Sequence, residues 1–347
     1  MPLRFGSMST PPYRASWVDR LTAWIAGLPG PTWVPYAIVS AVVGLAVHAA
    51  AWIDGLLAPG DIDLFLDSLA IYVVISLAAI QFLDHRATLA WKTFRPVASL
   101  TDEQAERILF ELTTLPARAV LGWTIVGLIV AVLTAAAGYG QPIDLAGEPI
   151  TFVVTLPLAA IAYVTGAMLV YHTIRQLRLI SRLQGDVERI DLLDAGPLHA
   201  FSAVTALTGG MFVAAAYFSV ITDPTTFTNP AVAAVNALAV VLAVACFVLP
   251  LYGMQRRIAA EKALRLSAAS HRLDAALRDL ARRNDAGDLS SADAVNNNIN
   301  SLLSERHLIA RTPTWPWSPD ALRGFSTALL LPIFLWLVFR VLEGVLA

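Results

Sequence analysis

The chain has 347 residues, of which 57% are hydrophobic and only 14% are charged. Soluble domains usually contain about a quarter charged residues, so this composition argues against a soluble protein. The 24 basic and 26 acidic side chains give a formal net charge of −2, which favours neither a nucleic-acid-binding protein nor one with a strongly acidic tail. The single cysteine, Cys246, excludes an internal disulfide framework and a cysteine-rich zinc site.

Seven stretches are long and apolar enough to cross a bilayer, which needs roughly 20 mostly apolar residues. They are residues 33–52, 66–83, 118–138, 150–171, 200–221, 231–252 and 325–342. Continuous apolar runs of this kind predict membrane helices rather than the alternating strands of a barrel. The predicted fold class is therefore all-α: a polytopic integral membrane protein with seven transmembrane helices, additional amphipathic helices and a helical, coiled-coil-like hairpin.

The basic residues are confined to one side of the predicted membrane. Of the 24 Lys and Arg residues, 23 lie in the N-terminal segment or in the connections after spans two, four and six, and the exception is Arg340. The positive-inside rule therefore places the N-terminus in the cytoplasm and the C-terminus on the exoplasmic side. Arginine outnumbers lysine 22 to 2, which favours a high-GC bacterial or archaeal source and localisation in the plasma (inner) membrane.

The chain divides into four predicted regions. Residues 1–32 form a cytoplasmic N-terminal segment with an interfacial helix. Residues 33–253 form a six-helix transmembrane region with short cytoplasmic helices at 85–117 and 172–198. Residues 254–323 form a cytoplasmic helical hairpin, and residues 324–347 form the seventh transmembrane helix and the exoplasmic C-terminus.

Capping signals support two of the short helices. Ser16-x-x-Asp19 resembles a capping box. The helix predicted after it has one apolar face that contains Trp17, Leu21, Trp24, Ile25 and Leu28. This pattern favours an interfacial helix, with a disordered tail as the alternative. A second capping box, Thr101 to Gln104, predicts a helix that stops before Pro116.

The connection between spans six and seven contains a candidate surface for contact with a partner. Leu266, Leu273 and Leu280 are seven residues apart, which predicts a short coiled-coil seam. A second helix, which Ser291 is able to cap, would complete an antiparallel hairpin that projects about 40 Å at 1.5 Å per residue. The seam favours contact with another subunit or protein, and the alternative is a solvated hairpin packed on the other cytoplasmic helices.

Small and hydroxyl residues form polar stripes on several predicted spans. The candidate residues are Gln81, Thr151, Thr155, Thr165, Thr205, Thr208, Gly209 and Asn236. Such stripes permit close helix packing and hydrogen bonds between helices in lipid. The functional alternative is a narrow hydrated path lined by hydroxyl groups.

Few other residues suggest chemistry. Two histidines at inner span ends, His85 and His172, are candidates for a metal or haem pair, with ordinary interfacial histidines as the alternative. Trp315 and Trp317 beside arginines predict an interfacial anchor, and a protein-binding loop is the alternative. Catalytic motifs are absent from the sequence, so we expect no enzymatic activity, no metal and no cofactor.

The leading functional hypothesis is a homo-oligomeric channel- or transporter-like protein for small ions or solutes, with the hairpin serving assembly or gating. The alternatives are a membrane sensor or scaffold and an accessory subunit of a larger membrane complex. The expected partners are the lipid bilayer and, through the hairpin, a second copy or a membrane-complex protein. We expect no nucleic-acid partner.

Overall fold

Long apolar helices build the structure, a computed structural model that describes residues 11–98, 100–136, 146–185, 196, 199–223, 229–286, 292–330 and 334. In chain order the elements are α1 (Trp17–Ala26), α2 (Trp33–Asp54), α3 (Leu64–Phe94), η1 (Arg95–Val97), α4 (Asp102–Thr113), α5 (Ala117–Ala136), α6 (Pro149–Gly185), α8 (Ser202–Thr222), α9 (Pro230–Asp285) and α10 (Ala292–Arg311). Residues 319–330 are also helical. Extended pairing within the described residues is limited to one isolated bridge, so the all-α prediction is confirmed.

Six of these helices are long and apolar enough to cross a membrane. They are α2, α3, α5, α6, α8 and α9, and they coincide with the first six predicted spans. The predicted seventh span, 325–342, begins within the helical stretch 319–330 and otherwise lies almost wholly outside the described residues. The seven-span count and the orientation in the membrane therefore stay predictions, as does the side on which the C-terminus lies.

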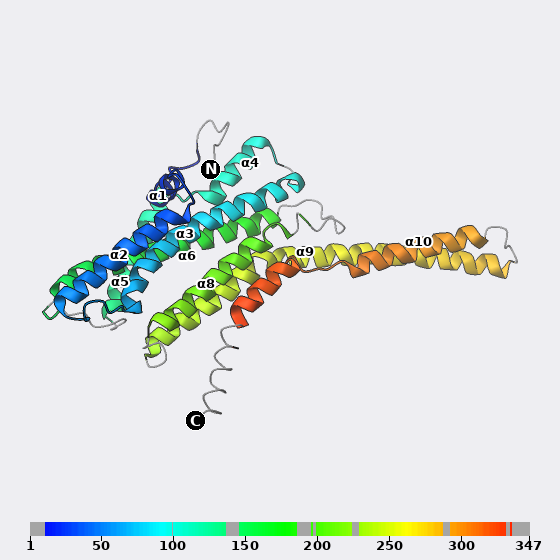
Figure 1. Cartoon of the computed structure of the whole chain (residues 1–347). Coiled ribbons are helices and arrows are strands. Elements are labelled where there is room, and N and C mark those ends of the chain that lie inside the picture. The colour runs from blue at the N-terminus through cyan, green and yellow to red at the C-terminus, as the bar shows by residue number, and fades with distance from the viewer. Residues whose placement is uncertain are drawn as a thin grey trace, which may run out of the picture.

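The helices form two groups that meet along α3 and α6 (Figure 1). Helices α1 to α6 make the first group, and α8, the apolar half of α9 and residues 319–330 make the second. Contacts of α3 with α8 and of α6 with α9 join them. In the second group the rings of Phe247 and Phe325 stack with their centroids 4.2 Å apart.

Helix α9 is a single 56-residue helix that continues from the membrane span into the hairpin. Figure 1 shows its C-terminal half leaving the bundle, with α10 running back alongside it. Ala269 of α9 and both Ile299 and Ile309 of α10 are buried in this hairpin region. The two predicted arms are therefore present and packed together, and the coiled-coil geometry of their seam stays a prediction.

Helix α1 begins at the predicted capping box and packs through Trp17, Leu21 and Ile25 of the predicted face, but not through Trp24. Val18, Thr22 and Ile25 are its buried residues, whereas Trp24 is 63% exposed. The hydrophobic pattern alone placed Trp24 on the same face as Ile25. Packing on α3 and on the turn after α4 selects the Val18 side instead, which leaves Trp24 free to contact lipid.

Helices α5 and α6 touch backbone to backbone at Gly127. A Cβ atom added to Gly127 would lie 2.7 Å from the Cα of Val164, whereas one added to Gly122 would have no heavy atom within 4 Å. Small residues permit this approach in lipid, where dispersion contacts rather than water exclusion hold helices together.

We expect Gly127→Ala to destabilise the protein by about 1–3 kcal/mol, because the added methyl group forces α5 and α6 apart. Gly122→Ala on the same helix is the matched control. It should leave stability unchanged or slightly higher, since alanine is the better helix former. Thermal unfolding of the purified variants in one detergent measures both effects, and equal stability of the two variants would contradict the close contact.

Candidate functional site: a polar junction between α1, α3, α4 and α6

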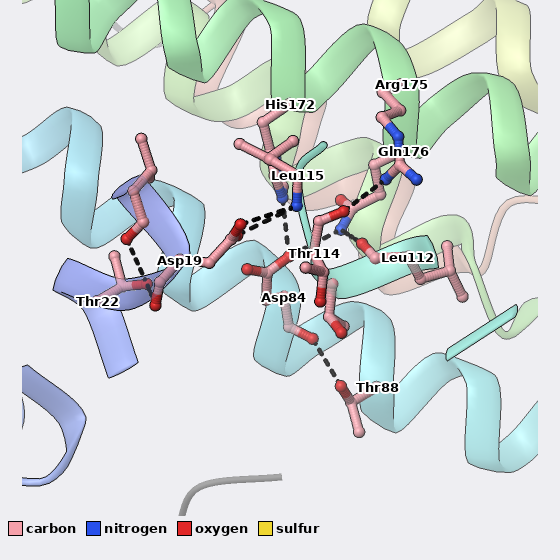
Figure 2. Close-up of polar contacts among 12 residues, drawn as sticks. Asp19, Thr22, Asp84, Thr88, Leu112, Thr114, Leu115, His172, Arg175 and Gln176 are labelled. Atoms are coloured by element: carbon pink, nitrogen blue, oxygen red, sulfur yellow. Dashed lines mark hydrogen bonds and ion pairs between the residues drawn. The ribbon is translucent and has the colours of Figure 1, made fainter. Parts of the chain in front are cut away.

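Buried and partly buried polar side chains from four segments meet at one end of the first helix group. We call this cluster the polar junction, and it comprises Tyr13, Asp19, Asp84, His172, Arg175 and Gln176. Figure 2 shows Asp19 reaching it from α1, Asp84 from α3 and three side chains from α6, all around the turn that follows α4. Basic residues of the N-terminal segment, α4 and the end of α6 surround this end of the bundle, which we call the basic end.

The N-terminal segment pairs with the turn between α4 and α5. The amide of Ser16 donates to the carbonyl of Leu115 at 3.1 Å, and the amide of Ala117 donates to the carbonyl of Arg14 at 3.1 Å. These bonds make a short antiparallel bridge between Ala15 and Pro116. The start of the described chain is thereby tied to a residue about a hundred positions later.

Asp19 joins helix capping to this pairing. Its carboxylate completes the predicted capping box, because it accepts from the amide and the hydroxyl of Ser16, each at 2.7 Å. The amide of Leu115 also donates to both of its oxygens, at 3.2 and 3.1 Å. Burial raises the pKa of the Asp19 carboxyl above its usual range, while the bonds from Ser16 and Leu115 oppose that shift.

Side chains of α6 satisfy the last carbonyl groups of α4. The guanidinium of Arg175 donates to the carbonyls of Glu111 and Thr114, the latter at 3.0 Å. The amide of Gln176 donates to the carbonyl of Leu112 at 3.1 Å. The final carbonyls of a helix lack partners within the helix, and a cation there also complements the helix dipole. Arg175 and Gln176 therefore act as a C-terminal cap supplied by another helix.

Tyr13 completes the shell around Arg175. Its hydroxyl donates to the carbonyl of Thr114 at 2.8 Å and accepts from the guanidinium of Arg175. The guanidinium carbon lies 5.3 Å from the centroid of the tyrosine ring, within the range of a cation–π contact. Burial raises the pKa of the Tyr13 phenol, although the nearby Arg175 charge partly lowers it.

At the centre of the junction, His172 pairs with Asp84. The Nε2 of His172 lies 2.7 Å from the Oδ1 of Asp84, and the two side chains are only 2% and 17% exposed. Gln176 Nε2 approaches the same oxygen at 3.5 Å. His172 Nδ1 and Gln176 Oε1 have no hydrogen-bond partner among the described residues. Removal of one member of such a buried pair leaves the other without compensation.

The structure assigns His172 a partner that sequence reasoning missed. His85, the predicted metal- or haem-binding partner, is exposed, whereas the buried His172 faces Asp84, the residue before His85. In the described part of the chain, no three His, Cys, Asp or Glu side chains form a group able to hold a metal ion. Asp84 and His172 both lie at span ends in the sequence, but their pairing depends on how α3 and α6 pack.

The threonines of the predicted polar stripe are buried, and most of their hydroxyl groups bond within their own helices. Thr155 donates to Thr151 O at 2.7 Å, and Thr165 donates to Ile161 O at 3.0 Å. Thr205 and Thr208 donate in the same way to carbonyls of α8, and Asn236 to one of α9. The hydroxyl of Thr151 has no partner among the described residues.

The remaining candidates serve contacts between helices. Gln81 accepts from the hydroxyl of Tyr36 at 3.1 Å and donates to the carbonyl of Thr22 at 3.2 Å, which links α1, α2 and α3. At Gly209, an added Cβ would lie 2.7 Å both from the carbonyl oxygen of Ala243 and from the ring of Phe325. The stripe of α8 therefore faces α9 and residues 319–330.

The predicted seam and the predicted anchor have distinct surroundings. Leu266, Leu273 and Leu280 are all partly buried. Trp317 is buried and donates its Nε1–H to the carbonyl of Phe247 at 3.1 Å, whereas Trp315 is 60% exposed. Of the two tryptophans, Trp315 is therefore the one whose position fits a membrane-interface anchor.

Comparison with protein families, with curated proteins and with solved structures finds no match to this chain. The functional argument consequently rests on the geometry alone.

We expect His172→Ala to lower the free energy of unfolding by about 3–5 kcal/mol, because it strands the buried Asp84 carboxylate. The double variant Asp84→Leu/His172→Leu should recover much of this loss, since it removes both charged partners together. Chemical denaturation of the purified proteins in detergent gives the free energy of unfolding of each variant. The single variants Asp84→Leu and His172→Leu complete the cycle, and a double variant whose loss equals the sum of their two losses would contradict the pairing.

A second prediction concerns the cap on α4. Arg175→Ala should cost about 2–4 kcal/mol of stability, because it leaves carbonyls of α4 unsatisfied and removes the cation over Tyr13. Arg178→Ala, one turn further along α6 at an exposed position, is the matched control and should change stability by less than about 0.5 kcal/mol. Proteolysis of the α4 segment in folded protein should also be faster in the Arg175 variant than in the control.

Proposed function

We propose that this protein is a membrane scaffold or sensor that presents the α9–α10 hairpin to a partner at the basic end of the bundle. In this proposal the basic end faces the cytoplasm, as the placement of the arginines indicates. The membrane spans hold the hairpin root, and the polar junction fixes the surrounding helices. The function is binding and signalling rather than catalysis.

The observation that carries the proposal is that α6 connects the polar junction to the root of the hairpin. One turn beyond His172, α6 contributes Leu177, Ile180 and Leu183 to the same hydrophobic cluster as three residues of α9. Those residues are Leu251, Met254 and Ile258. Arg257 of α9 also donates to the carbonyl of Gln184 at 2.7 Å, near the end of α6.

Rigid helices convert this contact into displacement at a distance. Because α9 is unbroken from Pro230 to Asp285, a shift of its root against α6 moves the whole hairpin. The hairpin arm beyond Arg257 extends about 40 Å at 1.5 Å per residue, so a small tilt at the root gives a larger movement at the tip. A change in the polar junction that repositions α6 would therefore move the tip of the hairpin.

A channel or transporter is the second candidate, and the buried threonines of α6 and α8 favour it. However, most of these hydroxyl groups already bond to carbonyls of their own helix, which makes them poor ligands for a passing ion. Threonines in such positions fit close helix packing in lipid equally well. The scaffold or sensor proposal needs no path through the bundle, and it gives the long hairpin a role.

We expect purified protein in liposomes to give no flux of small ions above that of protein-free vesicles. Spin labels at Arg107 on α4 and Ser301 on α10 should report a changed distance distribution in the His172→Ala variant, because the junction variant repositions α6. Arg178→Ala should leave the distribution as in the parent protein. Robust flux, or identical distributions in the two variants, would overturn the proposal.

A further inference from the structure

A buried histidine of α2 contacts the start of α3, at the end of α3 opposite Asp84. His48 is only 4% exposed, and its Nε2 accepts from the backbone amide of Asp63 at 3.0 Å. Its Nδ1 lies 2.9 Å from the carbonyl oxygen of Gly44. A backbone amide can only donate and a carbonyl can only accept, so Nδ1 carries the proton of the ring and Nε2 carries none. His48 is therefore a neutral imidazole in this arrangement.

The bond from Asp63 fixes the residue at which α3 begins. Asp63 is the N-cap of α3, and its carboxylate accepts from the amides of Phe65 and Leu66 at 2.7 and 3.3 Å. One turn beyond His48 on α2, Trp52 donates its Nε1–H to the carbonyl of Asp61 at 2.9 Å. Two side chains of α2 thus hold the segment that leads into α3.

A carboxylate that could pair with a positively charged ring lies close by. Asp67 Oδ1 is 3.6 Å from His48 Nδ1, which is too far for a hydrogen bond. A Cβ added to Gly44 would lie 3.0 Å from the same oxygen, so the glycine leaves room for the carboxylate to approach α2. The Asp67 side chain is 30% exposed, which gives protons from water a route to the ring.

The surroundings of the ring contain acidic groups and lack basic ones. The carboxylates on the segments that meet here are Asp54, Asp61, Asp63, Asp67 and, just before α6, Glu148. Residues 33–84 contain no Lys or Arg. Helix α6 contributes the uncharged Val154 and Leu158 to the neighbouring hydrophobic cluster. A positive charge on His48 would therefore meet carboxylates and no described cation.

Protonation of His48 would exchange one contact for the other. A proton on Nε2 would point at the amide proton of Asp63, and two donors cannot bond to each other. The same proton gives the ring a charge, and a carboxylate within about 4–6 Å favours the charged form. Imidazole is also the side chain that ordinarily changes charge between about pH 5 and pH 8.

We propose that His48 is a pH-sensitive switch at the start of α3. In its neutral form it holds the Asp63 amide, and in its protonated form it releases that amide and pairs with Asp67. The contact between α2 and Asp63 is thus kept above the pH range in which the ring takes up a proton and is lost as the pH falls through it. In the predicted orientation this end of the bundle faces the exoplasmic side. The inference goes beyond the proposed function and does not depend on it.

A spin label next to Asp63 tests the switch in the full-length protein in liposomes. Cys246 is replaced by alanine, and Ile62→Cys carries the label at a position that is 72% exposed. We expect the mobile component of the EPR spectrum to be at least about threefold larger at about pH 5 than at about pH 8, because the protonated ring releases Asp63.

Three further variants identify the groups responsible. His48→Gln places an amide oxygen near the position of Nε2 and cannot take up a proton, so its spectrum should not change with pH. His85→Gln, at an exposed position near the other end of α3, is the matched control and should respond as the parent protein does. Asp67→Asn should lower the pH at the midpoint of the response by about one unit, because the charged ring loses its partner.

Nuclear magnetic resonance of the unsubstituted protein with ¹⁵N-labelled histidine gives a measurement that needs no variant to fold. At about pH 8 we expect a neutral ring protonated at Nδ1 and unprotonated at Nε2, as the partners of His48 require. The proposal would be overturned by an Nε2–H tautomer, by a label whose mobility does not change on acidification, or by a His48→Gln variant that responds as the parent does. An unchanged midpoint in Asp67→Asn would equally overturn the pairing with Asp67.

Discussion

Backbone carbonyl groups at the end of α4 need hydrogen-bond donors, and this need organises the basic end of the molecule. The turn that follows α4 is held between α1 and α6, where water does not reach every carbonyl. An unpaired buried carbonyl costs free energy comparable to a lost hydrogen bond. Arg175 and Gln176 of α6 remove that cost, because they donate to the carbonyls of Thr114 and Leu112. Asp19 of α1 accepts from the amide of Leu115 in the same turn. Three segments distant in sequence, α1, α4 and α6, are therefore fixed by a backbone requirement of one short helix.

Ionisable side chains at the inner ends of the helices need partners in the same way as the backbone carbonyls of α4. A carboxylate and an imidazole in a nearly water-free setting are costly unless they pair, and Asp84 and His172 do so at 2.7 Å. Their pairing fixes the rotation of α6 against α3. Because helical side chains recur every 3.6 residues, that rotation also decides which residues of α6 face α9. The ionic contact and the hydrophobic contact at the hairpin root are thus two consequences of one helix orientation.

Local sequence signals predicted the elements well. Apolar runs predicted the six helices that are long and apolar enough to cross a membrane, and the capping boxes at Ser16 and Thr101 predicted the starts of α1 and α4. These features depend on residues a few positions apart, so they can be recognised in the chain alone. The buried face of α1 was not predictable in this way, because Val18 and Trp24 are both apolar and only packing on α3 distinguishes them.

The candidate site was harder to predict for the same physical reason. Asp84 and His172 are 88 positions apart, and Tyr13 and Thr114 are 101 positions apart. His172 was singled out as a histidine at a span end, but the identity of its partner depends on the tertiary arrangement. The threonines illustrate the converse case. The position of Thr151, Thr155 and Thr165 on one helical face is clear in the sequence, yet own-helix bonds such as that of Thr165 satisfy the hydroxyls without any path.

The hairpin shows the limits of a two-helix rod. Two helices enclose only a narrow line of residues, and here that line includes Ala269, Ile299 and Ile309. Side chains beside this line are covered only in part by the other arm, so Leu277 stays 45% exposed. Arg272 lies beside the same line and reaches Glu305 at 2.8 Å while it remains hydrated. The rod therefore has little core of its own, and its position depends on the contact of the unbroken α9 with α6 at the root.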